Sequence, residues 1–312
     1  MVSKTDLYFL TISKTGNLTQ AAQQLYVSQP SLSKYLQRLE TRLGAPLFDR
    51  SASPMRLTEC GEIYLQHLKD SIEQEKQLFE QIGEVTQNIR GTLRLGIPTF
   101  CGQCYLPQVL PIFVKEFPHV SLELYEKPGV KLEQALIDQM IDLAILYSPI
   151  IHESLTQRAI TKERILMAAQ RDETVPPERR GQPIYIREGT FSDLKGKPVI
   201  MPSSEQKLGQ TLINFFSKLG YQPPIYTRAE NTITMLELAA SGCGISFTPE
   251  SGLNTVSERI LNKLMFFSFT NSLSNWKLAA VTRQGTTMSP FAKRFVELMI
   301  TCAQQKFPDS NA

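Results

Sequence analysis

Between residues 7 and 43 apolar residues gather in three segments, and in the last of them, 32–43, they recur every three or four residues, which is the spacing of a helical face. The pattern predicts a first helix that ends at Gly16 and a short second helix capped by Asn17 or Thr19. The apolar face of the second helix would be Ala21, Ala22 and Leu25. Ser28 would then cap a third helix, which stops at Gly44.

The third helix has two contrasting faces. Its apolar stripe is Leu32, Leu36, Leu39 and Leu43. Its opposite face carries Gln29, Pro30, Ser33, Lys34, Gln37 and Arg38. Amides and hydroxyls can reach base edges and cations can meet phosphates, so this face suits the major groove of DNA. The pattern predicts a helix-turn-helix, although a plain amphipathic helix pair would look the same from periodicity alone.

Residues 58–88 contain no proline and are rich in Glu, Gln and Lys. An apolar seam with one polar break recurs at Leu65, Leu68, Ile72, Glu75, Phe79 and Ile82. Such a seam predicts one long helix that pairs with another helix. The alternative is a helix that packs on its own chain.

From Gly91 onward, predicted strands alternate with predicted helices, which is typical of an α/β fold. Strands are expected at 92–98, 120–127, 142–148, 197–202, 223–230, 244–250 and 276–283. Helices are expected at 105–117, 131–141, 205–219, 232–242 and 289–303. We expect a mostly parallel sheet in each of two subdomains joined by two crossover strands. The first would comprise 91–164 with 270–312, and the second 165–269.

Composition and charge predict a binding partner for the first part of the chain. The chain has 312 residues and the apolar and charged fractions of an ordinary globular protein. No 18-residue apolar run and no signal-peptide core are found, so a cytoplasmic location is expected. Residues 1–57 carry seven basic and three acidic groups, whereas the whole chain has a net charge of +3. The excess of cations at the start predicts a polyanionic partner for that segment.

The segment AAQQLYVSQPSLSKYLQRLETRLGAPLFDR, at 21–50, and RLTECG, at 56–61, resemble the opening of LysR-type transcriptional regulators. The resemblance implies a winged helix-turn-helix DNA-binding domain at 1–58 and a linker or dimerisation helix at 59–90. It also implies an effector-binding regulatory domain at 91–312, similar to periplasmic solute-binding proteins. The expected partners are promoter or operator double-stranded DNA, a small-molecule effector, further copies of the chain in a homodimer or homotetramer, and RNA polymerase.

The resemblance also assigns roles within the first domain. Gln29, Pro30, Ser33 and Lys34 would line the groove face, and Arg50 would meet a phosphate beside the wing. Many members carry an arginine at the wing tip where this chain has Ser53, so Arg56 would have to compensate. Cys60 replaces a usual alanine and is expected to be small and buried.

Hydroxyl and aromatic side chains follow the predicted strands of the regulatory domain. Ligands of open parallel sheets bind beyond the carboxyl ends of strands, near helix N-termini. The candidate effector-binding residues are Thr99, Phe100, Cys101, Tyr147, Ser203, Ser204 and Thr248. We expect a small organic anion there, and each hydroxyl could equally serve as an ordinary helix cap.

Cys101-Gly102-Gln103-Cys104 raises two alternatives. A CxxC motif is typical of thiol oxidoreductases, and it could also be the switch of a redox-sensing regulator. The peroxide-sensing branch of the family carries its paired cysteines in the second subdomain, where this chain has only Cys243. We therefore interpret Cys101 as part of the pocket wall. No catalytic residue, metal or cofactor is expected.

Overall fold

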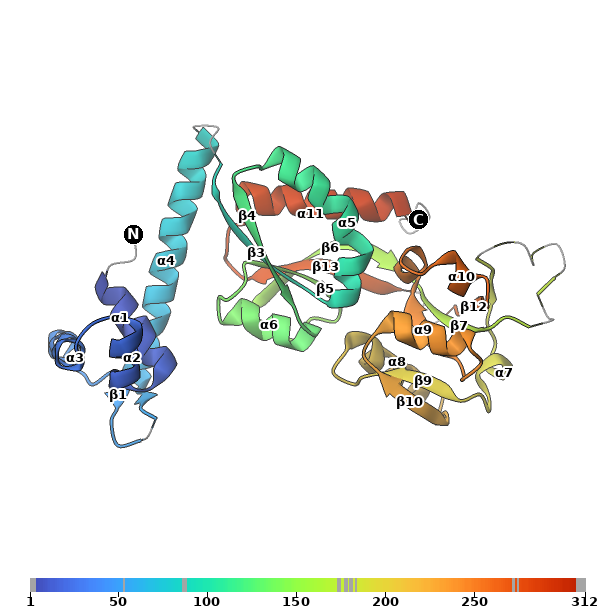
Figure 1. Cartoon of the computed structure of the whole chain (residues 1–312), viewed down its shortest axis with the longest axis horizontal. Coiled ribbons are helices and arrows are strands. Elements are labelled where there is room, and N and C mark those ends of the chain that lie inside the picture. Colours follow the sequence, from blue (N-terminus) through green and yellow to red (C-terminus); the bar gives the residue numbers. More distant parts are fainter. Residues whose placement is uncertain are drawn as a thin grey trace. The chain divides into compact units, whose positions relative to one another are not determined.

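The computed structural model describes residues 4–52, 54–85, 89–172, 175–176, 179, 182, 184–270, 273 and 275–306. The chain divides into two compact units, 1–88 and 89–312 (Figure 1). Among the described residues, none of the helices is both long and apolar enough to cross a bilayer.

The first unit is a winged helix-turn-helix followed by a long helix. Its elements are α1 (Lys4–Thr15), α2 (Leu18–Gln24), α3 (Gln29–Leu43), β1 (Phe48–Asp49), β2 (Arg56–Leu57) and α4 (Glu59–Val85). The Asn17 carboxamide accepts hydrogen bonds from the amides of Thr19 and Gln20, which caps α2. Ser28 caps α3, and Gly44 ends α3 with a φ of 71°. The predicted helix boundaries are thus confirmed.

The core of this unit is formed mainly by Phe9, Ile12, Leu32, Leu36 and Leu39. Leu43, the fourth member of the predicted stripe, is instead exposed, because it is the last residue of α3 and the chain turns away at Gly44. Cys60 was expected to be buried and is exposed. Both corrections concern the ends of helices, where periodicity no longer fixes the surroundings.

Helix α4 uses part of its apolar seam within its own unit. Leu68 is buried in the core just described, and Leu65 packs against that core half-buried. Ile63, Leu78 and Ile82 remain exposed. The side chain of Phe79 lies outside the described part. Helix α4 therefore packs on its own unit through Leu65 and Leu68 and carries an exposed apolar stripe, Leu78 and Ile82, further along.

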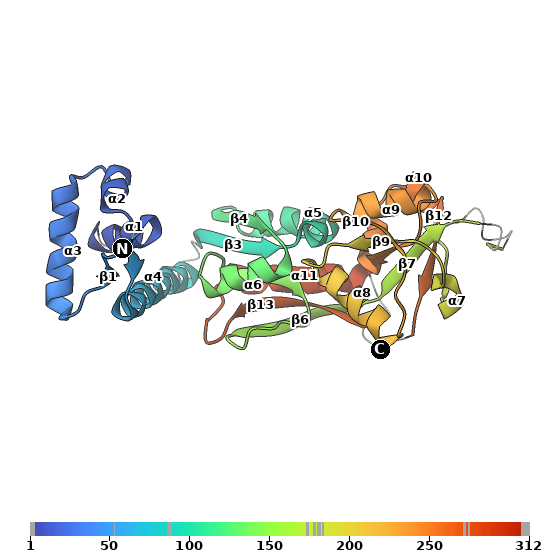
Figure 2. The same ribbon diagram turned by 90° about the horizontal axis from the view of Figure 1, so that it is seen from below.

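The second unit has two lobes, and the first is built on a five-stranded sheet (Figures 1 and 2). The strand order is β4 (Val120–Glu126), β3 (Gly91–Ile97), β5 (Leu143–Tyr147), β13 (Trp276–Arg283) and β6 (Leu155–Glu163). Helices α5 (Thr99–Glu116) and α11 (Pro290–Lys306) cover one face, and α6 (Gly129–Ile137) covers the other. Strands β4, β3, β5 and β6 run in one direction and only β13 is antiparallel to its neighbours, so the sheet is mostly parallel, as expected, with one reversed strand.

The second lobe is also built on mixed pairing. Its sheet has the order β11 (Ser246–Pro249), β7 (Ile165–Gln170), β12 (Leu264–Ser268) and β8 (Ile186–Glu188). The parallel pair β9 (Val199–Pro202) and β10 (Ile225–Ala229) joins it through a bridge between Val199 and Ile245. Helix α8 (Lys207–Lys218) packs on one side, and α9 (Thr232–Ala240) with α10 (Glu258–Leu261) on the other.

The chain passes between the lobes twice, from β6 to β7 at Arg164 and from β12 to β13. One hydrophobic core contains side chains from both lobes, including Ile145 and Tyr105 of the first and Met167 and Phe247 of the second. The two lobes therefore share a packed interior beside the crossings.

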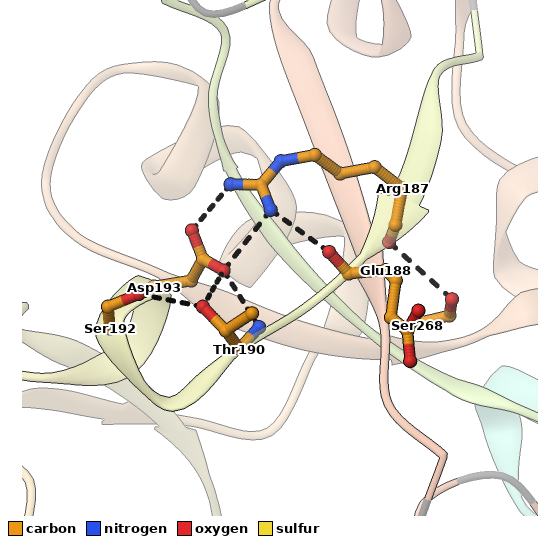
Figure 3. A network of polar contacts seen from close by, with 6 residues as sticks. All are labelled: Arg187, Glu188, Thr190, Ser192, Asp193 and Ser268. Atoms are coloured by element: carbon orange, nitrogen blue, oxygen red, sulfur yellow. Dashed lines mark hydrogen bonds and ion pairs between the residues drawn. The ribbon is translucent and has the colours of Figure 1, made fainter.

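A polar network fixes the connection between β8 and α7 (Phe191–Leu194) in the second lobe (Figure 3). The Arg187 guanidinium lies over the Phe267 ring and donates hydrogen bonds to both Asp193 carboxylate oxygens. The Thr190 amide donates to the same carboxylate at 2.8 Å. Burial alone would raise the pKa of Asp193, but the bonds from Arg187 and Thr190 outweigh it and lower that pKa. None of these residues belongs to the sites below.

Candidate DNA-reading surface and ligand cavity

The outer face of α3 presents the polar side chains that the sequence singled out. Gln29, Pro30, Lys34, Gln37 and Arg38 are exposed. Ser33 is half-buried, since it lies nearer the apolar stripe. Within the described part of the chain, no ion pair holds Lys34 or Arg38, so both cations are available to an external anion.

Arg50 stands in a different environment, because it is tied to α3 by Glu40. Its Nη2 donates a hydrogen bond to Glu40 Oε2 at 2.8 Å. Glu40 Oε1 accepts the Leu47 amide at 2.8 Å, at the start of the wing. The carboxylate thus joins the third helix to the wing, and Arg50, with 49% of its side chain exposed, can offer only its remaining donors to a phosphate.

The wing itself is a two-stranded antiparallel hairpin in which Asp49 faces Arg56. Arg56 is exposed. The hydroxyl and amide of Ser51 both donate to Asp49, which lowers the pKa of that carboxyl. Ser53, the expected site of the missing wing arginine, lies outside the described residues.

The second unit contains a cavity of about 510 Å³ between elements of its two lobes. The first lobe contributes the ends of β3, β4 and β5, together with Trp276 of β13. The second contributes the segments before α8 and α9, together with Pro249 of β11. The lining residues include Pro98, Thr99, Phe100, Cys101, Gln103, Pro128, Gly129, Tyr147, Gln206, Lys207, Asn231, Thr232 and Trp276.

Four helices begin at this cavity. They are α5 and α6 of the first lobe and α8 and α9 of the second. At α9 the Asn231 carboxamide accepts the amides of Ile233 and Thr234. The N-cap residues of α5, α6 and α8 make no side-chain capping bond. Four positive ends of helix dipoles, three of them without such a cap, favour an anionic group in the space between them.

Four of the seven candidate effector residues line the cavity: Thr99, Phe100, Cys101 and Tyr147. Ser203 and Ser204 do not, because α8 begins at Lys207, later than predicted, and Glu205 to Leu208 occupy the wall instead. Thr248 is completely buried within β11, and its hydroxyl donates to the Pro249 carbonyl.

Sequence reasoning missed much of the charged lining. Exposed Lys127 and Lys131 and exposed Glu126, Glu205 and Glu230 lie around the cavity, and Lys207 is buried in its wall. The signal available was their position at the ends of predicted strands or at the start of the helices that follow, where only hydroxyl and aromatic side chains were predicted to bind the ligand. Trp276 gave no such signal, because it begins its strand rather than ending it.

The aromatic wall rests on a buried carboxylate. The rings of Tyr147 and Trp276 stack with centroids 3.6 Å apart. The Tyr147 hydroxyl donates a hydrogen bond to Glu163 Oε1, and Glu163 Oε2 accepts the Ser251 amide of the second lobe at 2.8 Å. Burial raises the pKa of Glu163 despite these two bonds. Glu163 therefore connects the cavity wall to the place where the chain crosses between lobes.

Cys101 and Cys104 both lie inside α5, which begins earlier than predicted, at Thr99. Both side chains are buried, and neither forms a disulfide bond within the described part of the chain. Cys101 lines the cavity, whereas Cys104 packs in the shared core. The CxxC motif thus contributes one residue to the cavity wall and one to the hydrophobic interior.

A recognition helix with a wing in one unit, and a ligand-sized cavity between two α/β lobes in the other, define a ligand-responsive DNA-binding regulator. The family model "Bacterial regulatory helix-turn-helix protein, lysR family" matches residues 7–62. The model "LysR substrate binding domain" matches residues 86–302. The chain belongs to the LysR family of transcriptional regulators.

Individual relatives agree with this assignment over nearly the whole chain. The HTH-type transcriptional regulator AlsR of Bacillus subtilis (strain 168) is 26% identical, covering 98% of this chain and 97% of its own. A mutant of OxyR from Corynebacterium glutamicum has a similar fold, with a TM-score of 0.64, 21% identity and coverage of 99% and 94%. Full-length CbnR complexed with its target DNA gives a TM-score of 0.58, 20% identity and coverage of 95% and 98%.

Proposed function

We propose that this LysR-family regulator binds operator DNA through α3 and the wing and that a small organic carboxylate in the cavity of the second unit modulates this binding. The outer face of α3 supplies base-edge and phosphate contacts from Gln29, Pro30, Ser33, Lys34, Gln37 and Arg38. Arg50 and Arg56 add phosphate contacts at the wing. The function is regulatory rather than enzymatic, in the cytoplasm, with RNA polymerase as a further partner.

The convergence of four helix N-termini on one cavity carries the effector assignment. Two come from each lobe, so a carboxylate bound among them contacts both lobes at once. Phe100, Tyr147 and Trp276 provide an apolar wall for the rest of the ligand. Ligand contacts to both lobes favour one relative arrangement of the lobes, which is how a small molecule could alter DNA binding.

These roles divide the chain into three functional regions. Residues 1–58 read DNA, 59–90 connect and pair two chains, and 91–312 bind the effector, with 91–164 plus 270–312 in one lobe and 165–269 in the other. The exposed stripe of Leu78 and Ile82 on α4 supports pairing with a second copy. A homodimer presents two reading heads to a partly palindromic operator, and two dimers would form the homotetramer.

A thermal-shift screen of small carboxylates and their amides on the full chain tests the effector assignment. A ligand present at about 100 times its dissociation constant adds about 2.7 kcal/mol of stability. Thr99→Ala should reduce the shift given by an active carboxylate, whereas Ser203→Ala, outside the cavity, should leave it unchanged. An equal loss of the thermal shift in both variants would show that the carboxylate does not bind in this cavity.

Redox sensing through Cys101 and Cys104 is the second candidate, because Cys101 reaches a ligand-accessible cavity. The burial of both thiols opposes it, since oxidation requires access and thiolate character. Operator affinity measured with and without mild peroxide, in wild type and Cys101→Ser, separates the two candidates. A peroxide effect that disappears in Cys101→Ser would favour the redox function.

A further inference from the structure

A buried ion pair crosses the cavity wall between the two lobes. Lys207, the first residue of α8 in the second lobe, places its Nζ 3.1 Å from Glu133 Oε1 of α6 in the first lobe. Each side chain is only 8% exposed. Two opposite charges removed from water in this way are retained only where their surroundings compensate them.

The remaining contacts of the pair all lie in the first lobe. Lys207 Nζ donates to the Pro149 carbonyl at 2.7 Å, and Glu133 Oε2 accepts the Ile151 amide at 3.2 Å. A lysine ammonium has three N–H donors, and among the described residues Lys207 Nζ donates to the Pro149 carbonyl, while Glu133 Oε1 lies within ion-pair distance but makes no hydrogen bond. Because Lys207 itself lines the cavity and Glu133 does not, an anionic ligand is placed to accept from a remaining donor of the ammonium.

Gly129 shapes the approach to this ammonium. It is the first residue of α6, and a Cβ there would lie 3.5 Å from Lys207 Cγ and 3.6 Å from Lys207 Cε. The start of α6 therefore lies directly against the lysine stem. The amino group, its counter-ion and a helix N-terminus are held together at one side of the cavity.

Resting on the proposed function, we propose that Lys207 anchors the anionic group of the effector and that Glu133 sets the strength of this attraction. Glu133 neutralises the lysine, so the cavity does not retain every anion, and only a ligand that also fits the aromatic wall gains enough affinity. In addition, a ligand held by Lys207 contacts a side chain that ties α8 to the first lobe. Lys207 is thus a specificity-determining residue.

Trp276 provides the probe, because it is the only tryptophan of the chain and lies in the cavity wall. The experiment measures how strongly iodide, an anion, and acrylamide, a neutral solute, quench the fluorescence of Trp276 in the full chain. The ratio of the two quenching constants reports the attraction of anions to the cavity. Acrylamide corrects for changes in access, so a variant that simply opens the fold does not imitate a charge effect.

The iodide-to-acrylamide ratio should be highest in Glu133→Gln and lower in wild type. It should be lower again in the double variant, which carries both Glu133→Gln and Lys207→Met, and lowest in Lys207→Met alone. The ratio should fall about twofold from Glu133→Gln to wild type, and about twofold from the double variant to Lys207→Met, since each of these steps changes the charge of the cavity by one unit. The double variant has the same net charge as wild type, so its lower ratio would show that the ammonium itself binds the anion. It also keeps the test valid if the lone buried glutamate of Lys207→Met prevents folding.

Lys131→Met is the matched control, because Lys131 also lines the cavity but is exposed to solvent. Its ratio should stay near the wild-type value.

Equal ratios in wild type and the double variant, or lower ratios in both Lys207→Met and Glu133→Gln, would overturn the proposal. Failure of acrylamide to quench wild type would overturn the cavity and this proposal together. A carboxylate that binds Lys207→Met as tightly as wild type would overturn the anchor and leave the proposed function standing.

Discussion

The hydroxyl of Tyr147 donates a hydrogen bond to the buried carboxylate of Glu163, while the ring of the same tyrosine forms part of the ligand cavity. The second oxygen of Glu163 accepts an amide from the other lobe. One acidic side chain therefore supports the cavity wall and joins the lobes at their crossing. Its charge state should matter for stability.

Glu163→Gln should change how stability depends on pH. The pKa of Glu163 is raised in the folded chain, mainly by burial, so the fold binds this proton more tightly than the unfolded chain does. The resulting stabilisation is fully present below the ordinary glutamate pKa of 4.5 and is lost as pH rises through the raised value. Wild type should therefore lose stability relative to Glu163→Gln over that window, by at most about 1.4 kcal/mol per pH unit.

Urea unfolding followed by Trp276 fluorescence at several pH values measures this difference. Tyr147→Phe serves as a companion, because it removes a donor to the same carboxylate and should cost about 1–3 kcal/mol near neutral pH. A wild-type advantage over Glu163→Gln that stays constant across the window would show that Glu163 is not a buried acid with a raised pKa.

Glu40→Ala should destabilise the first unit by about 1–3 kcal/mol, because it leaves the Leu47 amide and Arg50 without their shared acceptor. Glu40→Gln keeps one acceptor oxygen and should cost less. Thermal unfolding measures both, with exposed Gln23→Ala of α2 as the control. An effect of Glu40→Ala no larger than that of Gln23→Ala would refute the role of this carboxylate in holding the wing.

Arg38→Ala should weaken operator binding and reduce the salt dependence of that binding. Each phosphate contact contributes a slope of about −0.9 to the dependence of log K on log salt concentration. Losing one contact in each head of a dimer should therefore reduce the slope by about 2. Fluorescence anisotropy at several salt concentrations gives the slope, with exposed Lys293→Ala of α11 as the control. An unchanged slope would place Arg38 away from the DNA backbone.

Ile82→Asp should shift the chain from dimer to monomer, because it puts a charge on the exposed stripe of α4 where a second helix would pack. Sedimentation velocity over a range of concentrations measures the change. Met140→Asp, an equally exposed apolar position in the second unit, should leave the assembly unaltered. If Ile82→Asp sediments as wild type does, chain pairing does not use this stripe.

The helix-turn-helix was readable from sequence because its signals are local. Caps at Asn17 and Ser28, a stripe of leucines and a terminal glycine each act within a few residues. Local signals did not predict the elements whose formation depends on tertiary contacts. Strand β6 was not predicted, because its first residues are largely exposed and offer no apolar alternation.

The cavity was located more accurately than its residues were identified. Strand ends after β3 and β5 gave Thr99, Phe100, Cys101 and Tyr147, since parallel strands bring those ends together. The turn between β9 and α8 is longer than the sequence suggested, and Lys207 rather than Ser203 reaches the wall. Glu133 and Glu163 lie in a helix and a strand whose local pattern says nothing about partners in the other lobe.

Whether the effector binds in this cavity is tested by equilibrium titration of the full chain with a carboxylate found in the screen. The titration is followed by Trp276 fluorescence and repeated in a cavity-filling variant. Gly129→Leu suits this purpose, because a Cβ at Gly129 meets only ordinary contacts and the longer side chain would occupy ligand space. We expect a saturable change in wild type and Ser203→Ala, with at least tenfold weaker binding in Gly129→Leu, about 1.4 kcal/mol. Equal affinity in wild type and Gly129→Leu would show that the effector binds elsewhere.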